Sequence, residues 1–119
     1  AAAEKQLRTA LDLKPSAEIK LLVQTRLARV LAARKQYPAA LAVLDDADAD
    51  AAAAPLVAEI RGDILLLQGQ RDAAAKAYVA ADAALAARDE ARPLLDLKLA
   101  DVGMTPARRA SDLAAEVQP

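Results

Sequence analysis

Residues 55–85 read PLVAEIRGDILLLQGQRDAAAKAYVAADAAL, and this stretch decides the fold of the chain. Its first half places apolar side chains at helical spacings, at Leu56, Ile60, Ile64 and Leu65. A turn is expected at 69–71. Small residues stand where two helices must touch, at Gly62 in the first half and at Ala74 and Ala81 in the second. Tyr78 lies one turn from each alanine. The pattern predicts a tight helical hairpin, whose apolar face needs neighbours to cover it.

The hairpin pattern recurs 34 residues upstream. The matching pairs are Leu27/Arg61, Ala28/Gly62, Leu31/Leu65, Lys35/Gly69, Ala40/Ala74, Leu44/Tyr78 and Ala47/Ala81. A degenerate third copy continues the register at Leu95, Asp96, Leu99 and Gly103. A period of 34 residues is that of the tetratricopeptide repeat, a helix-turn-helix unit that stacks into a solenoid. We therefore expect an all-α, right-handed helical solenoid of antiparallel helix pairs.

The repeat register divides the chain into a domain over 1–103 and a C-terminal helix or tail over 104–119. Within the domain, we expect the second helix of an incomplete repeat at 1–13, full repeats at 17–50 and 55–87, and a capping helix at 90–103. The long helix at 17–35 should bury the face formed by Ile19, Leu22, Val23, Leu27, Val30 and Leu31. The incomplete first repeat would leave an apolar groove, which a second copy could fill to form a homodimer.

Composition narrows the possible functions. Apolar residues make up 55% of the sequence but aromatic residues only 2%, so the helices should pack by close approach of small side chains. The net charge is −1 and the isoelectric point about 5.4, which gives no electrostatic case for nucleic-acid binding. The absence of cysteine excludes disulfides, thiolate metal sites and cysteine nucleophiles. No uncharged apolar run approaches the roughly 20 residues that span a bilayer.

Two short motifs and the residue inventory bear on whether the chain carries out chemistry. The run Asp45–Asp50 looks like a calcium loop, but the positions that need Gly and Glu hold Ala51 and Val57, which favours a solvated loop. The Arg-Gly-Asp tripeptide at 61–63 falls mid-helix, where it cannot act as a displayed adhesion motif. With no His or Cys and only two serines, the chain offers no nucleophile-base set. We expect a non-enzymatic protein without a metal or cofactor.

A repeat solenoid offers a concave surface lined by the first helix of each pair. The positions predicted to face it are Leu22, Thr25, Arg29, Leu56, Glu59, Asp63, Leu66 and Leu97. This mixture suits an amphipathic helix or an extended peptide. Repeat domains that bind the C-terminal carboxylate of a peptide need Lys, Arg and Asn clustered at these groove positions. This sequence has Thr25 and Glu59 there, so a carboxylate-binding site of that kind is not expected. The alternative is that these leucines pack against other segments of the same chain.

Three runs of sequence carry a family resemblance. They are Leu27-Ala28-Arg29-Val30, Ala40-Leu41 with Leu44-Asp45, and the stretch at 58–69, AEIRGDILLLQG. Together they resemble the periplasmic region of YfgM-like proteins, ancillary subunits of the SecYEG translocon, over roughly residues 1–103. The resemblance implies a repeat domain on the periplasmic side of the bacterial inner membrane, tethered by a spanning helix upstream of Ala1. It also implies the translocon and periplasmic chaperones as partners. A cytoplasmic scaffold or regulator that uses the same groove is the alternative.

Overall fold

The computed structural model describes residues 2–47 and 53–117, which form helices joined by short loops and contain no strand. The helices are α1 (Ala2–Asp12), α2 (Ala17–Ala33), α3 (Tyr37–Ala47), α4 (Ala54–Leu67), α5 (Arg71–Ala86), α6 (Pro93–Asp101) and α7 (Ala110–Val117). The all-α prediction is confirmed, and the hairpin expected from residues 55–85 is the pair α4 and α5.

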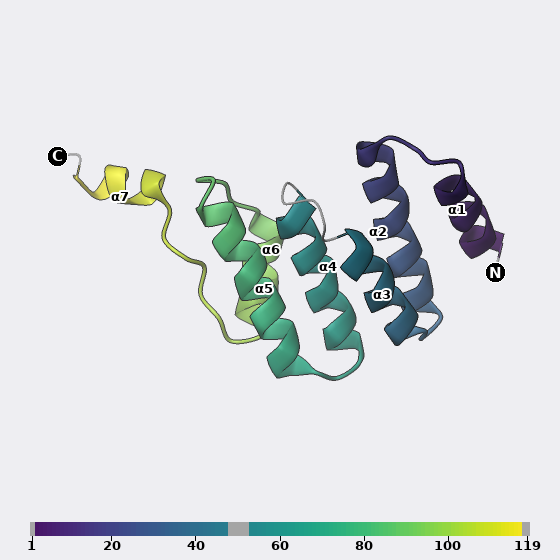
Figure 1. The fold of residues 1–119 in the computed structure, drawn as a ribbon. Helices are drawn as coiled ribbons and strands as arrows, with labels where there is room; N and C mark the ends of the chain where they lie inside the picture. The colour runs from purple at the N-terminus through teal and green to yellow at the C-terminus, as the bar shows by residue number, and fades with distance from the viewer. Residues whose placement is uncertain (1, 48–52, 118–119) are drawn as a thin grey trace.

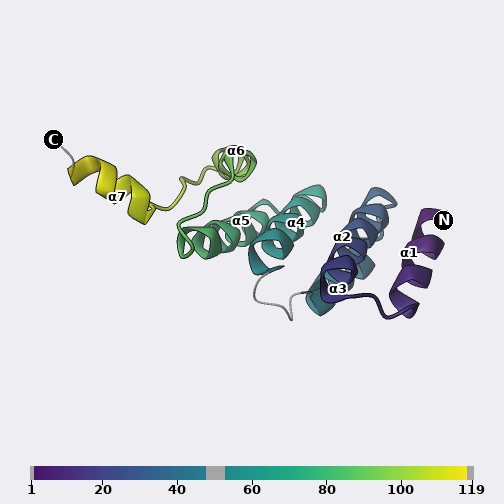
Figure 2. The ribbon, with the colours of Figure 1, turned by 90° about the horizontal axis from the view of Figure 1, so that it is seen from above.

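The helices run from α1 at one end of the molecule to α7 at the other, with α6 lying beside α4 and α5 rather than beyond α5 (Figures 1 and 2). The molecule measures 57 × 33 × 18 Å and has a radius of gyration of 16.0 Å. A compact domain of this length would have a radius of gyration of about 13.5 Å. The chain is therefore elongated, as expected when each helix pair contacts only its neighbours.

The 34-residue period appears in the backbone as a recurring helix end. Lys35, Gly69 and Gly103 follow α2, α4 and α6 and have positive φ angles of 60°, 77° and 78°. The residue after each donates its backbone N–H to a carbonyl five residues back, on Leu31, Leu65 and Leu99, at 2.8, 2.9 and 2.8 Å respectively. This hydrogen-bond pattern is the Schellman ending of a helix. The same turn thus closes the first helix of each repeat, including the degenerate third copy.

The closest approach between α4 and α5 is at Gly62. A Cβ atom at this position would lie 2.5 Å from Cε1 and 2.6 Å from Cδ1 of Tyr78, far inside van der Waals contact. Tyr78 is 1% exposed, and Ala74 and Ala81 on either side of it are fully buried. Glycine therefore stands at 62 because the tyrosine ring occupies the space of its side chain. The tripeptide at 61–63 lies inside α4, as expected.

The apolar core is divided into two clusters by α4. One cluster joins α2 and α3 to one face of α4 and includes Leu27, Leu44 and Ile60. The other joins α5 and α6 to the opposite side of α4, through Tyr78 and Leu95 among others. Leu7 and Leu11 of α1 are only partly buried against the first cluster. Helix α4 is the one element common to both clusters.

The expected buried face of the long helix is wrong at its first turns. Ile19 is 53% and Leu22 50% exposed, whereas Leu27 and Leu31 are fully buried. Val23, Gln24 and Thr25 in the same stretch are buried, and Asp46 near the end of α3 contacts Lys20 and Gln24. Helix α3 therefore covers a different side of these turns from the one that carries Ile19 and Leu22.

The C-terminal segment is attached by polar contacts rather than by apolar burial. Arg109 is 5% exposed, and its Nη2 lies 2.5 Å from Oδ1 of Asp82 on α5. The other carboxylate oxygen of Asp82 accepts a 2.6 Å hydrogen bond from the backbone N–H of Ala107. Ser111 donates both its backbone N–H and its hydroxyl to Asp89, at 3.1 and 3.0 Å. These contacts fix where α7 begins, at the end of the molecule opposite α1.

Candidate protein-binding face

The structure separates the eight predicted groove residues by exposure. Leu22, Arg29 and Leu97 are exposed, Leu56, Asp63 and Leu66 are partly buried, and Thr25 and Glu59 are buried. Thr25 donates its hydroxyl to the backbone carbonyl of Leu22 at 3.0 Å, which satisfies it within its own helix. The side chains that a partner could reach are therefore mainly Leu22 and Arg29 on α2 and Leu97 on α6.

The two predicted acidic residues belong to a charged network that joins α4 to α6. Glu59 is 2% exposed, with Arg92 Nε 3.2 Å from its Oε1 and Lys98 Nζ 2.9 Å from its Oε2. Lys98 also lies 3.1 Å from Oδ2 of Asp63. A buried carboxylate is stable only when it is paired and hydrogen-bonded, and both conditions hold for Glu59. Arg92 and Lys98 therefore neutralise Glu59 and Asp63 without any external ligand.

Tyr78 extends this network to α5. Its hydroxyl donates a 2.7 Å hydrogen bond to Oδ1 of Asp63. Burial raises the pKa of Tyr78 well above its usual range, and the hydrogen bond and negative charge of Asp63 raise it further. Tyr78 therefore stays neutral and acts as a fixed donor. It contacts Gly62 with its ring and Asp63 with its hydroxyl, so one side chain sets the position of α5 on α4.

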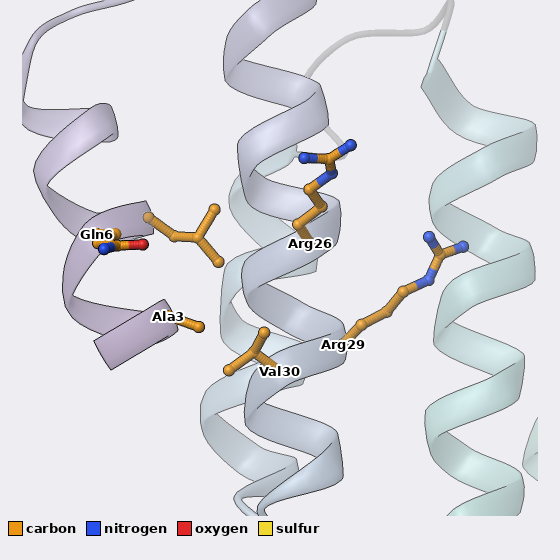
Figure 3. A pocket seen from close by; sticks show the side chains of 6 residues that line it. Ala3, Gln6, Arg26, Arg29 and Val30 are labelled. Carbon is orange, nitrogen blue, oxygen red and sulfur yellow. The ribbon is translucent and has the colours of Figure 1, made fainter. Parts of the chain in front are cut away.

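An open cleft lies between α1 and α2, with a volume of about 460 Å³ (Figure 3). Its lining residues are Ala3, Gln6, Leu7, Arg26, Arg29 and Val30. Figure 3 shows Ala3 and Val30 between the two helices, while Arg26 and Arg29 extend from α2 on the side away from α1, with Arg29 directed toward α4. We call this feature the α1–α2 groove. It combines an apolar floor with two cationic side chains on one edge.

Arg26 and Arg29 differ from the other arginines of the chain. Among the described residues, neither one has a hydrogen-bonding or ion-pair partner, while each of the other eight arginines makes at least one specific interaction. Arg34, for example, lies 3.5 Å from Glu4 across the same helix pair. Arg26 and Arg29 therefore lie beside an apolar floor without a charged partner among the described residues.

The sequence pattern identifies Arg29 but only part of the rest of the groove. Arg26 is three residues before Arg29, a spacing that places both on one side of a helix and could have indicated the pair. Val30 is predicted on the buried face of its helix, and an apolar groove is predicted at the incomplete first repeat, where Ala3 and Leu7 share a helix face, but the pattern does not show that these side chains line one groove with Val30. The floor depends on how α1 packs across α2, which the repeat period does not specify.

The described residues give no support for a metal site or for a membrane-spanning helix. No group of three or more Asp, Glu, His or Cys side chains in 2–47 and 53–117 is arranged to hold a metal ion. The first half of the acidic run that resembles a calcium loop, Asp45–Ala47, lies in α3 rather than in a loop. The second half, from Asp48 to Asp50, lies outside the described residues, as does Ala51. Across the helices that the structure describes, none is both long enough and apolar enough to cross a membrane.

A row of antiparallel helix pairs with an open, partly apolar face defines an α-helical repeat protein. The family model described as a tetratricopeptide repeat-like domain matches residues 1–104, and the chain belongs to this family. Domains of this family generally bind proteins or peptides, and their fold is typically non-catalytic. The comparisons with curated proteins and with solved structures gave no match.

Proposed function

We propose that this protein is an interaction module that receives an amphipathic segment of a partner protein on the face formed by α1 and α2. The observation that carries the proposal is the α1–α2 groove, with its apolar floor and the unpaired Arg26 and Arg29. An apolar groove with cations on its edge suits a helix or strand that is apolar on one side and acidic on the other. The exposed Leu22, on the same helix, extends the apolar surface.

We further propose that the module works on the periplasmic side of the bacterial inner membrane, tethered by an upstream anchor. Its partners there would be the SecYEG translocon and periplasmic chaperones. This setting is supported by the resemblance of residues 27–30, 40–45 and 58–69 to YfgM-like proteins. The family match adds the coarser support that such domains bind proteins. Emerging chains expose the apolar segments that an open groove of this kind accommodates.

Site-specific photo-crosslinking in cells tests the proposal. A photoreactive residue replaces Leu22 in the gene's full-length product, and the captured proteins are compared with those captured from Val79. These positions are 50% and 42% exposed, and Val79 lies on α5, away from the groove. We expect capture of translocon subunits or chaperones from position 22 that is lost in an Arg26→Glu/Arg29→Glu background. Equal capture from both positions would argue against the groove, and partners confined to the cytoplasm would refute the periplasmic setting.

A further inference from the structure

The described side chains of α7, from Ala110 to Ala115, are all exposed. Helix α7 stands clear of the other helices (Figures 1 and 2), and Leu113 within it is 49% exposed. Its sequence, ASDLAAEV, contains two acidic residues and no basic one. The contacts of Arg109 and Ser111 hold only its start. Among the residues that the structure describes, the exposed Leu113 therefore lacks a close packing partner.

The α1–α2 groove has the complementary chemistry at the opposite end of the molecule. Its floor is apolar, and Arg26 and Arg29 have no carboxylate partner among the described residues. The two arginines are three residues apart, about one helical turn, so they lie on one side of α2. The exposed Asp112, whose Oδ2 also accepts a 3.1 Å hydrogen bond from the backbone N–H of Arg109, gives α7 a charge opposite to that of the two guanidinium groups. The opposite charges can therefore attract while the exposed Leu113 meets the apolar floor.

We propose that α7 of one copy docks into the α1–α2 groove of a second copy. The α7 that docks cannot be that of the same chain, because α1 and α7 lie at opposite ends of a molecule 57 Å long (Figure 1). The contact joins two different surfaces and is therefore heterologous: it produces either an open head-to-tail chain or an antiparallel pair with both ends engaged. An eight-residue helix buries less than the roughly 1,200 Å² of a stable interface, so the association is weak and concentration-dependent.

Sedimentation analysis of the purified protein over a wide concentration range tests this docking. Two variants each disable one side of the contact: Arg26→Glu/Arg29→Glu in the groove and Leu113→Glu on α7. We expect the wild-type average mass to rise with concentration, and each variant to associate at least about ten-fold more weakly, because like charges or a buried carboxylate replace the attraction. The control Leu67→Glu changes a leucine that is 62% exposed on α4 and should associate as the wild type does.

A second control matches the charge change of the groove variant. Lys14→Glu/Lys76→Glu alters net charge by the same amount at exposed positions outside both surfaces, and it should leave association unchanged. Circular dichroism should show native helicity in every variant, since all the changed side chains are exposed.

Mixing the two defective variants gives the decisive result. The groove variant retains an intact α7, and the Leu113→Glu variant retains an intact groove, so one productive contact remains possible between them. We expect the mixture to form a one-to-one dimer that does not grow further. A wild-type protein that stays monomeric, a defective variant that associates like the wild type, or a mixture that stays monomeric would overturn the proposal. Because the assay contains only this protein, its result is independent of the partner proposed above.

Discussion

Gly62→Ala is expected to destabilise the protein, although alanine is the better helix former. The added Cβ would lie 2.5 Å from Cε1 of Tyr78, whereas carbon atoms in good contact are about 3.5–4.0 Å apart. The ring cannot retreat freely, because it is 1% exposed and its hydroxyl is bonded to Asp63 at 2.7 Å. Helix α4 or α5 must shift, or the ring must leave its site.

The magnitude follows from three contributions. Overpacking a close contact costs about 1–3 kcal/mol. Losing the hydrogen bond from Tyr78 to a charged acceptor costs about 1.5–3 kcal/mol if the ring moves. The gain in helix propensity from glycine to alanine offsets about 1 kcal/mol. The net loss is therefore about 0–2 kcal/mol if only the helices shift and about 1.5–5 kcal/mol if the ring also loses its hydrogen bond, and each kcal/mol lowers the melting temperature by roughly 4 °C for a chain of this size. Gly62→Leu should cost more, because its larger side chain meets the same ring.

A double-mutant cycle measured by urea denaturation separates the clash from the propensity effect. In a Tyr78→Leu background the ring is absent, so Gly62→Ala should be neutral or stabilising by up to about 1 kcal/mol. The Tyr78→Phe background keeps the ring but removes the hydroxyl, and there the substitution should still destabilise. If Gly62→Ala had the same effect in all three backgrounds, the ring would not be what requires glycine at 62.

Three further results are expected. In Tyr37→Phe, which leaves Tyr78 as the only tyrosine, tyrosinate absorbance should develop at a higher pH in the folded protein than in urea, where the pKa is about 10. Because folding raises this pKa, stability should be intact below about pH 10 and fall as pH rises above it; equal titration midpoints would contradict this. Lys98→Met should lower the free energy of unfolding by about 1.5–3 kcal/mol, since two carboxylates lose a charged donor, and an unchanged urea midpoint would show that the network adds nothing. Asp82→Asn leaves Arg109 buried and unneutralised at a cost of roughly 3–5 kcal/mol. Limited proteolysis should then cut between α6 and α7 faster than in the wild type, whereas an unchanged cleavage rate would place the attachment elsewhere.

The repeat architecture could be predicted because it depends on local sequence. Gly69 and Gly103 mark helix ends that need a positive φ, and the 34-residue spacing extends this to Lys35, which no propensity would have selected. The contact between Gly62 and Tyr78 could also be predicted, since a small residue facing a large one at helical spacing marks a close helix crossing. These features depend on one hairpin and its register.

The binding face could be predicted only in part, because burial in it depends on contacts between repeats. Glu59 lies at a position that faces the groove in the register, yet Arg92 and Lys98 from the next repeat cover it. A carboxylate on a helix gives no sign of whether a distant cation will reach it. The buried pair of Asp82 and Arg109 could not be predicted for the same reason, since the two residues are 27 positions apart and follow no periodic pattern.

The sharing of α4 between two apolar clusters has a consequence for backbone amide exchange. Opening the α2–α3 side leaves α4 covered by α5 and α6, and opening the other side leaves it covered by α2 and α3. An amide on α4 can therefore exchange with solvent only after both sides have opened, whereas amides on α1 and α7 need only a local opening. Deuterium uptake should be slowest near Ile60 and Ile64 and should increase toward each end of the molecule.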